Sequence, residues 1–188
     1  MPVNSPVEDL AELLLTPEKA ATLDAHGRTD AAVLLPLYGW PERPGLVFTE
    51  RRSDLRRHAG EVSFPGGRQD AGEDLRRPAL REAEEEVGLD PGQVNMVGAL
   101  PPVGTYVTSY KIHPFVGLVG DDLDLRPNPA EVEAVLRFEL AELREAFAMR
   151  RLVRRGVPIR TPTYEVGRQM IWGATARILQ QLLERLPG

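Results

Sequence analysis

The sequence predicts a mixed α/β protein in which a β-sheet lies between helices. Two observations lead to this prediction. One segment, 75–87, has the spacing of a helix with one buried face, and strand-like apolar segments lie both before and after it. The strand-like segments are 31–38, 46–51, 94–103, 112–119 and 132–138. They do not alternate regularly with helices, as the strands of a parallel doubly wound sheet would, so we expect a mixed sheet.

The composition is that of an ordinary globular chain. Its 188 residues fit one domain, and 42% hydrophobic with 27% charged residues exclude a mostly disordered chain. The absence of cysteine excludes disulfides, thiolate zinc sites and a cysteine nucleophile. A net charge of −5 argues against general binding to nucleic acid or to an anionic membrane. There is neither an apolar run of the ~20 residues that a membrane helix needs nor a basic amino-terminal segment, so we expect a cytoplasmic protein.

Local signals set the first elements. Val7–Leu15 has apolar residues at helical spacing, and Thr16 followed by a proline is a typical start of a second short helix. The run 31–38 is continuously apolar, which favours a buried strand. Together with 46–51 it predicts a hairpin whose long loop is rich in proline and glycine.

Periodicity predicts two helices after the last strand. Residues 140–149 are expected to form one helix, and 171–186 a long amphipathic terminal helix. We expect Trp172 and Ile178 in the core, because they belong to the apolar face of the terminal helix. That face is broader than an ordinary surface stripe, so a homodimer with a second subunit packed on part of it stays open.

The central helix, 75–87, has an acidic face. Asp74 is placed to cap its start, and Gly88 to end it. Glu84 points to another side of the helix at about 100° per residue. Three other carboxylates share one face: Glu82, Glu85 and Glu86.

A solvated acidic face is one interpretation of these carboxylates, and a metal site is the other. Like charges at this spacing oppose helix formation, and the helix dipole disfavours anions near the carboxyl end. Arg81 can relieve Glu85, whereas Glu82 and Glu86 have no basic partner at helical spacing. Divalent cations such as Mg²⁺, which prefer carboxylate oxygens, would relieve this repulsion.

A glycine loop precedes the helix. Pro65-Gly66-Gly67 lets the backbone turn sharply and approach a ligand, although a Gly-Gly pair alone is usually only a turn. The combined spacing is much more specific: Gly67-x5-Glu73-x7-Arg81-Glu82-Ala83-x-Glu85-Glu86-x-Gly88-Leu89. This pattern resembles, at every position, the signature of the Nudix hydrolase family.

The resemblance implies a fold and an activity. The Nudix fold is a mixed β-sheet between helices (α/β/α), so the resemblance implies one Nudix domain over 1–188, with a core at 30–145 and the signature at 67–89. Residues 1–29 and 165–188 would be helical flanks. The implied reaction is hydrolysis of a pyrophosphate linked to a nucleoside, with Mg²⁺ or Mn²⁺ as the cofactor. Such metal ions neutralise the phosphate charges and generate a bound hydroxide nucleophile.

The resemblance also implies roles for individual residues. The implied metal ligands are Glu82, Glu85, Glu86 and the carbonyl of Gly67. Glu82 or Glu85 would also orient or deprotonate the attacking water, and Arg81 would fix the carboxylates. Glu73 would act through these groups rather than bind metal itself.

Outside the signature the sequence offers weaker candidates. A further acid or base could come from Glu131 or Glu133, although a strand-edge role is the more ordinary interpretation. The three histidines, His26, His58 and His113, are scattered, and we expect them at the surface or in loops. No serine–histidine pair suggests a covalent route.

A narrower resemblance concerns the substrate. The positions that match the extra motif of the coenzyme A pyrophosphatase branch are Val47, Phe48, Thr49, Arg56, Gly60 and Phe64–Gly67. Arg52 departs from that motif, where the branch tends to have a small residue. The segment 171–176, with Trp172, resembles the start of the branch's last helix.

Coenzyme A has a 3′-phosphate beside its diphosphate, so a specific site needs several guanidinium groups. The substrate-binding residues expected are Arg51, Arg56, Arg57 and Gly66. A solvated basic loop is the alternative for these arginines. The predicted products are 3′,5′-ADP and 4′-phosphopantetheine. The alternatives are the same chemistry on ADP-ribose or NADH, and a non-catalytic nucleotide-binding module.

Overall fold

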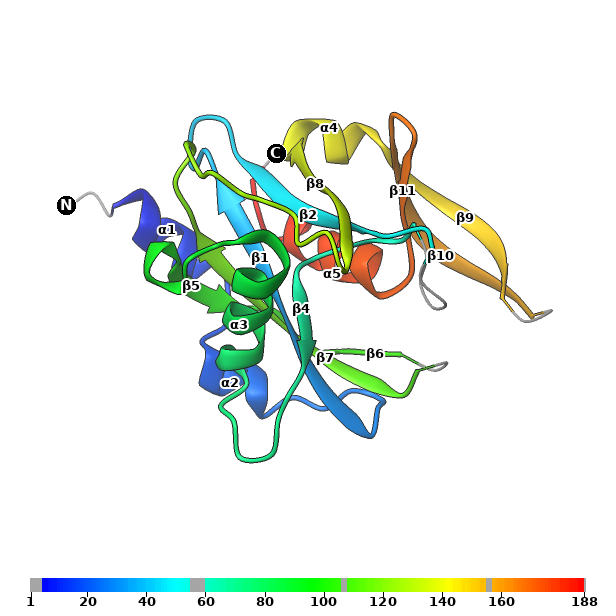
Figure 1. Ribbon diagram of the computed structural model, residues 1–188, viewed down its shortest axis with the longest axis horizontal. Helices are drawn as coiled ribbons and strands as arrows, with labels where there is room; N and C mark the ends of the chain where they lie inside the picture. Colours follow the sequence, from blue (N-terminus) through cyan, green and yellow to red (C-terminus); the bar gives the residue numbers. More distant parts are fainter. Residues whose placement is uncertain (1–4, 55–59, 106–107, 155–156, 188) are drawn as a thin grey trace.

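A mixed β-sheet forms the centre of the structure, which is a computed structural model (Figure 1). It describes residues 5–54, 60–105, 108–154 and 157–187. The sheet has the order β3-β2-β1-β7-β5, and β4, β6 and β8 pair with β1, β7 and β2 respectively. Its strands are β1 (Thr29–Tyr38), β2 (Gly45–Arg51), β3 (Val62–Ser63), β4 (Gly66–Arg68), β5 (Asn95–Ala99), β6 (Val103–Gly104), β7 (Tyr110–Leu118) and β8 (Val132–Glu139). β1 and β7 are parallel and their other neighbours are antiparallel, so the sheet is mixed, as predicted.

Helices cover both faces of this sheet. Ala32 and Leu34 of β1 pack in one apolar cluster with α3 (Arg76–Val87) and α2 (Pro17–Ala21). Leu35 and Leu37 belong to the other cluster, which contains α5 (Gly173–Leu183) and residues of α1 (Pro6–Glu12). Successive side chains of a strand point to opposite faces, so the continuous apolar run of β1 serves both clusters. The predicted α/β/α layering is therefore confirmed.

A second sheet, with the order β11-β10-β9, was not predicted. It contains β9 (Phe147–Arg154), β10 (Val157–Val166) and β11 (Gln169–Ile171). The helix expected over 140–149 is wrong in its second half, because α4 (Leu140–Glu145) ends before β9 begins. The apolar spacing of residues 140–149 suits a helix, but backbone pairing with β10 makes the second half a strand. The sequence does not reveal β10 as a strand, because it contains two prolines.

The helical flank expected over 165–188 is also wrong at its start. Residues up to Ile171 form strands, and Gly173, whose φ is 67°, turns the chain into α5. Ile178 is a core residue as predicted, but Trp172 is only half-buried at the strand–helix junction. Ile178, Leu179 and Leu182 are covered within the protomer, so the broad apolar face of α5 gives no reason for a second subunit.

The other helix boundaries differ only slightly from expectation. Thr16 caps α2 as predicted, its hydroxyl accepting a hydrogen bond from the Lys19 amide at 3.2 Å. α3 begins one residue later than Asp74 would set it, and the Asp74 carboxylate accepts from the Arg76 amide at 2.9 Å instead. Gly88 ends α3 with φ 69°, as predicted. A short 3₁₀ turn, Pro91–Gln93, follows.

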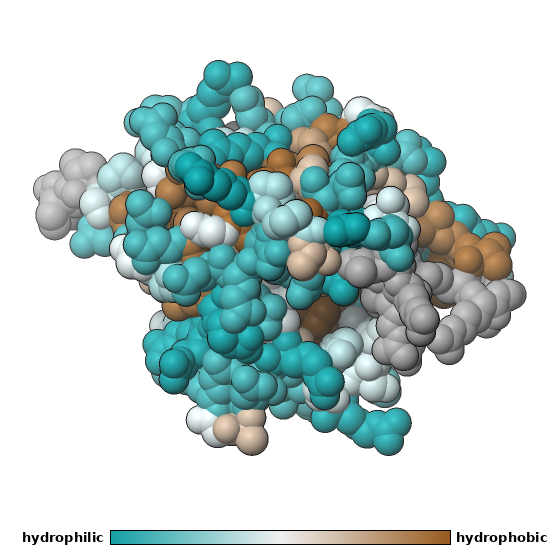
Figure 2. All heavy atoms as spheres, viewed as in Figure 1, coloured by the Kyte–Doolittle hydropathy of each residue, from teal (hydrophilic) through white to brown (hydrophobic). Residues whose placement is uncertain are grey.

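The exposed apolar side chains gather on the second sheet. Phe147, Met149 and Val153 of β9 are 43%, 42% and 70% exposed, and Figure 2 shows apolar colour on this projecting end of the molecule. In the described part of the chain, none of the helices combines the length and apolar character that crossing a membrane requires.

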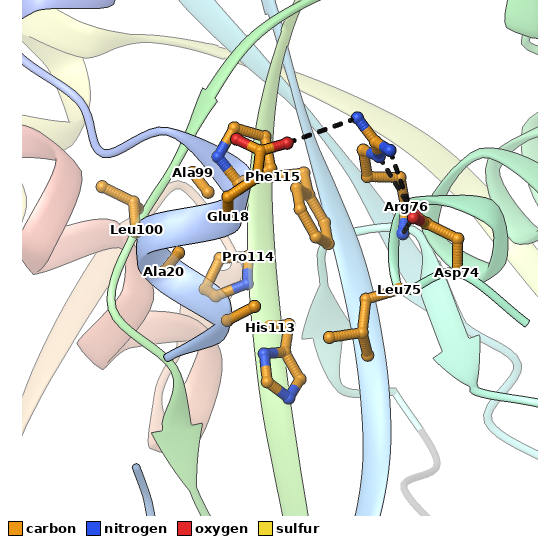
Figure 3. A pocket seen from close by; sticks show the side chains of 12 residues that line it. Glu18, Ala20, Asp74, Leu75, Arg76, Ala99, Leu100, His113, Pro114 and Phe115 are labelled. Carbon is orange, nitrogen blue, oxygen red and sulfur yellow. Dashed lines mark hydrogen bonds and ion pairs between the residues drawn. The ribbon is translucent and has the colours of Figure 1, made fainter. Parts of the chain in front are cut away.

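A small, partly open pocket of about 180 Å³ lies between α2, the start of α3 and β7 (Figure 3). His113 lies beside it and is buried, which corrects the surface or loop position expected for the histidines. Its Nε2 atom lies 2.8 Å from Oδ1 of Asp30, so the buried ring has a polar partner. The pocket adjoins the amino-terminal end of α3, away from the acidic residues of its carboxyl-terminal half.

Candidate active site

The buried stripe of α3 fixes the direction of its acidic face. Ala79, Ala83 and Val87 are fully buried against the central sheet. Residues that flank such a stripe lie at the boundary between core and solvent. Glu82 and Glu86 accordingly are half-buried, whereas Glu84 on the other side is exposed. The helical spacing therefore predicted the separation of Glu84 from Glu82 and Glu86, but Glu85, which it placed with them, is exposed.

The glycine loop lies directly against these carboxylates. The Gly66 amide donates to Oε2 of Glu86 at 3.3 Å. A Cβ atom on Gly67 would lie 2.4 Å from Cδ and Oε1 of Glu82, and one on Gly66 would lie 2.3 Å from the carbonyl oxygen of Ala32. Both distances are too short for real Cβ contacts, so a side chain at Gly66 would collide with the β1 backbone and one at Gly67 would displace the Glu82 side chain.

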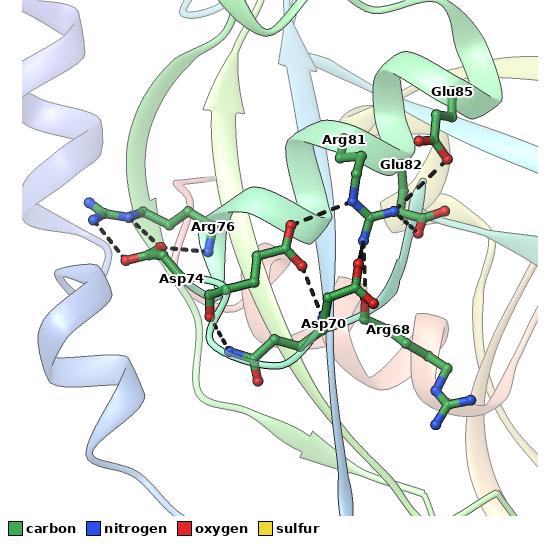
Figure 4. Close-up of polar contacts among 9 residues, drawn as sticks. Arg68, Asp70, Asp74, Arg76, Arg81, Glu82 and Glu85 are labelled. Atoms are coloured by element: carbon green, nitrogen blue, oxygen red, sulfur yellow. Dashed lines mark hydrogen bonds and ion pairs between the residues drawn. The ribbon is translucent and has the colours of Figure 1, made fainter.

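Arg81 organises the surrounding polar groups (Figure 4). Its Nη1 donates to Oε1 of Glu82 at 2.7 Å and lies 3.9 Å from Oε2 of Glu85. The expectation that Glu82 lacks a basic partner is therefore wrong: the partner is its chain neighbour, which helical spacing had assigned to Glu85 alone. Nη2 of Arg81 also donates to the carbonyl of Arg68 at 3.2 Å, which ties the helix to β4.

Glu73 holds Arg81 from the other side. Its Oε1 lies 3.5 Å from Nε of Arg81, and its Oε2 accepts from the Asp70 amide at 3.0 Å. The backbone hydrogen bond from Asp70 is the largest cause that lowers the pKa of Glu73, and Arg81 adds to it. Glu73 thus favours its charged form and lies against Arg81, in contact with the carboxylate-bearing helix.

Burial disfavours negative charge on the two inner carboxylates. The pKa of Glu86 is raised to about 8: burial is the largest cause, the charges of Glu82 and Glu131 add to it, and the Gly66 amide and Arg51 oppose it. Burial also raises the pKa of Glu82, although Arg81 opposes the shift. Glu85 is 59% exposed on the outer edge. A cation beside Glu82 and Glu86 would compensate the cost of their ionisation.

The chemistry of these donors fits a hard divalent cation, which takes carboxylate and carbonyl oxygens. In the conformation described for residues 5–54, 60–105, 108–154 and 157–187, no three acidic or histidine side chains converge closely enough to enclose one. Glu82 points one oxygen at Arg81 instead.

A cleft of about 580 Å³ opens near the acidic face, although Glu82, Glu85 and Glu86 are not among the residues that line it; Arg51, whose charge acts on Glu86, connects the two. Arg51 lines the cleft, and its Nη1 lies 3.8 Å from Oε2 of Glu131, the residue whose charge reaches Glu82 and Glu86. Nε of Arg51 is buried and has no hydrogen-bond partner among the described residues. Glu133 also lines the cleft.

The other predicted substrate residues have mixed outcomes. Arg56 and Arg57, like His58, lie outside the described residues. Arg52 is held by Asp54, 2.5 Å from its carboxylate, and by the Pro129 carbonyl, so it fastens the loop instead of facing the cleft. Gly66 lies at the acidic face, as described above.

Sequence reasoning missed one wall of the cleft. Arg168, Gln169, Met170 and Trp172 line it from β11, the preceding turn and the following junction. This wall is carried by the second sheet, which the sequence pattern did not reveal. The only signal was the aromatic residue before Gly173, and it was interpreted as core.

Comparison with known proteins identifies the family. The NUDIX domain model matches residues 28–156. A relative from Escherichia coli O1:K1, described as an uncharacterized Nudix hydrolase NudL, is 41% identical over 155 residues, covering 81% of this chain and 80% of its own length.

Solved structures show the same fold. A MutT/nudix family protein from Enterococcus faecalis matches with a TM-score of 0.57 and 13% identity, over 98% of this chain and 75% of that one. The NUDIX domain of Shewanella oneidensis NrtR, complexed with ADP ribose, matches with a TM-score of 0.50 and 16% identity, over 68% of this chain and 85% of that one. On the family model and the Escherichia coli relative, the chain belongs to the Nudix hydrolase family.

Proposed function

We propose that this Nudix hydrolase cleaves the pyrophosphate bond of coenzyme A, producing 3′,5′-ADP and 4′-phosphopantetheine, with Mg²⁺ or Mn²⁺ as cofactor. The observation that supports it best is the half-buried pair Glu82 and Glu86, which lies against Gly66 and Gly67 and beside a cleft that contains Arg51. Acidic groups for cations and a basic group for an anion are thus adjacent, as a charged pyrophosphate substrate requires.

The cation would be held by Glu82, Glu85, Glu86 and the Gly67 carbonyl, and when bound it supplies charge neutralisation for the phosphates and an acidified water. Arg81 has two tasks: it holds Glu82 in place, and it keeps the carboxylates from repelling each other. Glu85 is the base that accepts the proton of the attacking water, because it is the most exposed of the three and its Arg81 contact is long, at 3.9 Å.

Arg51 would bind an oxygen of the substrate diphosphate. Its buried Nε without a partner among the described residues is costly unless a ligand accepts from it. Arg56, Arg57 and the Gly66 backbone complete the proposed substrate contacts, on the strength of the motif that precedes the signature. The preference for coenzyme A over other nucleoside diphosphates rests on this set of arginines.

ADP-ribose is the second candidate, since the Shewanella oneidensis protein is complexed with it. It shares the diphosphate and adenosine of coenzyme A but lacks the 3′-phosphate. A non-catalytic nucleotide-binding module is the third candidate, and the intact set of signature carboxylates argues against it.

A product assay tests the proposal. The purified protein is incubated with coenzyme A, dephospho-coenzyme A, ADP-ribose or NADH, in the presence of Mg²⁺, Mn²⁺ or a chelator. The products are separated by chromatography and identified by mass spectrometry. We expect 3′,5′-ADP and 4′-phosphopantetheine from coenzyme A only with metal. Faster cleavage of ADP-ribose or NADH than of coenzyme A would contradict the substrate assignment. No cleavage of any compound would contradict the enzyme assignment.

A further inference from the structure

The cleft beside the acidic face has a wall formed by the carboxyl-terminal part of the chain. Of its lining residues, Arg168 lies in the β10–β11 turn, Met170 in β11 and Trp172 immediately before α5. Sequence pattern places none of them near the signature, which ends at Leu89. The wall is therefore a feature of the tertiary structure, and the cleft that it lines also contains Arg51 of β2, whose charge acts on Glu86.

A buried hydrogen bond fixes this wall. Nε2 of Gln169, a residue only 9% exposed, donates to Oε2 of Glu50 at 3.0 Å. Nη2 of Arg168 lies 3.8 Å from the same oxygen, and the Glu50 side chain is 15% exposed. Glu50 precedes Arg51 in β2, so the two walls of the cleft are joined at the residue next to the proposed diphosphate contact. A wall held in this way is preorganised for a ligand.

The side chains of the wall differ from those of the acidic face. Trp172 and Met170 offer an aromatic surface and a polarisable thioether, and both suit a flat aromatic ring. The Arg168 side chain is 83% exposed at the rim of the cleft. Its guanidinium can contact an anion there while it remains near the Glu50 carboxylate. Glu133 lines the cleft as well and can accept hydrogen bonds from an amino group.

We infer that this wall is the adenosine subsite: Trp172 and Met170 take the adenine ring, Arg168 takes the 3′-phosphate, and Gln169 positions all three. The inference rests on the proposed function, because coenzyme A supplies both the adenine and the 3′-phosphate. Its pantetheine half lies outside this cleft. On this assignment the second sheet selects the substrate, and the carboxylates of α3 carry out the hydrolysis.

Trp172 is itself the probe for this inference. The chain has two tryptophans, and Trp40 is not among the residues that line the cleft; its Nε1 donates to the Pro6 carbonyl at 2.8 Å. In a Trp40→Phe protein the fluorescence therefore reports on Trp172 alone. With Mg²⁺ present, we expect 3′,5′-ADP and 5′-AMP to quench it, and 4′-phosphopantetheine to leave it unchanged. Quenching by 4′-phosphopantetheine, or by none of the three, would overturn the assignment of the cleft.

Arg168→Gln tests the phosphate contact in the same assay. A charge-assisted contact to phosphate predicts that the parent binds 3′,5′-ADP about tenfold more tightly than 5′-AMP, and that Arg168→Gln binds both alike. Arg160→Gln, at an exposed arginine of β10 outside the cleft lining, is the matched control and should keep the preference. A preference that survives Arg168→Gln would overturn the role of Arg168.

Steady-state kinetics separate stacking from folding. We expect Trp172→Leu to raise the KM for coenzyme A about tenfold with kcat within about threefold, and Trp172→Tyr to restore KM. Gln169→Leu should raise KM in the same sense if it positions the wall. Equal loss of kcat in Trp172→Leu and Trp172→Tyr would overturn the subsite. Failure of the parent protein to cleave coenzyme A would instead remove the proposed function, while the quenching result decides the cleft by itself.

Discussion

The signature region and the carboxyl-terminal sheet both lie near the end of β2, where Arg51 acts on the charge of Glu86 and Glu50 accepts a hydrogen bond from Gln169, but they are built in different ways. α3 and its loop are local: a buried stripe of small residues, two glycines at close approach and an arginine hold the carboxylates within a short span of sequence. The wall with Trp172 depends on strand pairing and on the long-range contact of Gln169 with Glu50. The comparison teaches that the proposed catalytic site is encoded locally, whereas the proposed selecting wall is encoded by tertiary contacts.

The largest effect is expected from the inner carboxylates. Glu82→Gln and Glu86→Gln should each lower kcat/KM roughly a thousandfold, because loss of a proposed metal ligand would remove several kcal/mol of transition-state stabilisation. Both are half-buried with raised pKa, so removing the charge leaves the fold intact.

Glu84→Gln is the matched control on the same helix, and its turnover should be unchanged, since Glu84 is exposed on another side. Turnover measured with coenzyme A and Mg²⁺ checks all three variants. Wild-type activity in Glu82→Gln or Glu86→Gln would break the assignment of chemistry to α3.

A smaller loss is expected when the close approach of β4 is disturbed. In Gly67→Ala the new methyl group displaces the Glu82 side chain, whose Cδ would lie 2.4 Å away. Misplacing a catalytic group by about 1 Å can cost up to a hundredfold in rate, and we expect a loss of roughly ten- to a hundredfold.

Gly120→Ala is the matched control, because the added Cβ would meet nothing within 4 Å. Activity and melting temperature are measured for both variants. Equal activities would show that the glycine loop does not position Glu82.

The pKa of Glu86 predicts a pH-dependent stability without metal. Between the ordinary value of 4.5 and about 8, the folded protein keeps a proton on Glu86 that the unfolded chain has released. Stability therefore falls as the pH rises through this window. Glu86→Gln removes this loss, so in the presence of a chelator its Tm should exceed that of the parent by roughly 5 °C at pH 8 and by little at pH 5. A difference independent of pH would contradict the buried state of Glu86.

The smallest effect is expected at the outer end of the second sheet. Val153 is 70% exposed on β9 and lies outside the cleft lining, so Val153→Thr should change kcat/KM and Tm only marginally. Kinetics with coenzyme A and thermal unfolding check this. A clear rise in KM would show that the selecting surface extends along β9 beyond the wall at Trp172.

The two regions also differ in how far the sequence predicts them. The acidic face and the buried stripe of α3 follow from helical spacing, whereas the sequence predicts a sharp turn at Gly66 and Gly67 but not the closeness of Gly67 to Glu82. Ion pairs between neighbouring residues of the chain cannot be predicted from helical spacing, which assigned Arg81 to Glu85 and missed its hydrogen bond with Glu82. β9 to β11 were missed because their stability comes from pairing between strands, two prolines obscure β10, and no periodicity marks Gln169 as the partner of Glu50.

The ratio of kcat/KM for coenzyme A to that for dephospho-coenzyme A is the most direct test of this division of labour. It is measured for the parent, Gly67→Ala and Arg168→Gln. Gly67→Ala acts on the chemistry, so it should lower both values and leave the ratio unchanged, whereas Arg168→Gln should bring the ratio close to one. A ratio that changes in Gly67→Ala, or one that survives Arg168→Gln, would contradict the separation of chemistry on α3 from selection by the carboxyl-terminal wall.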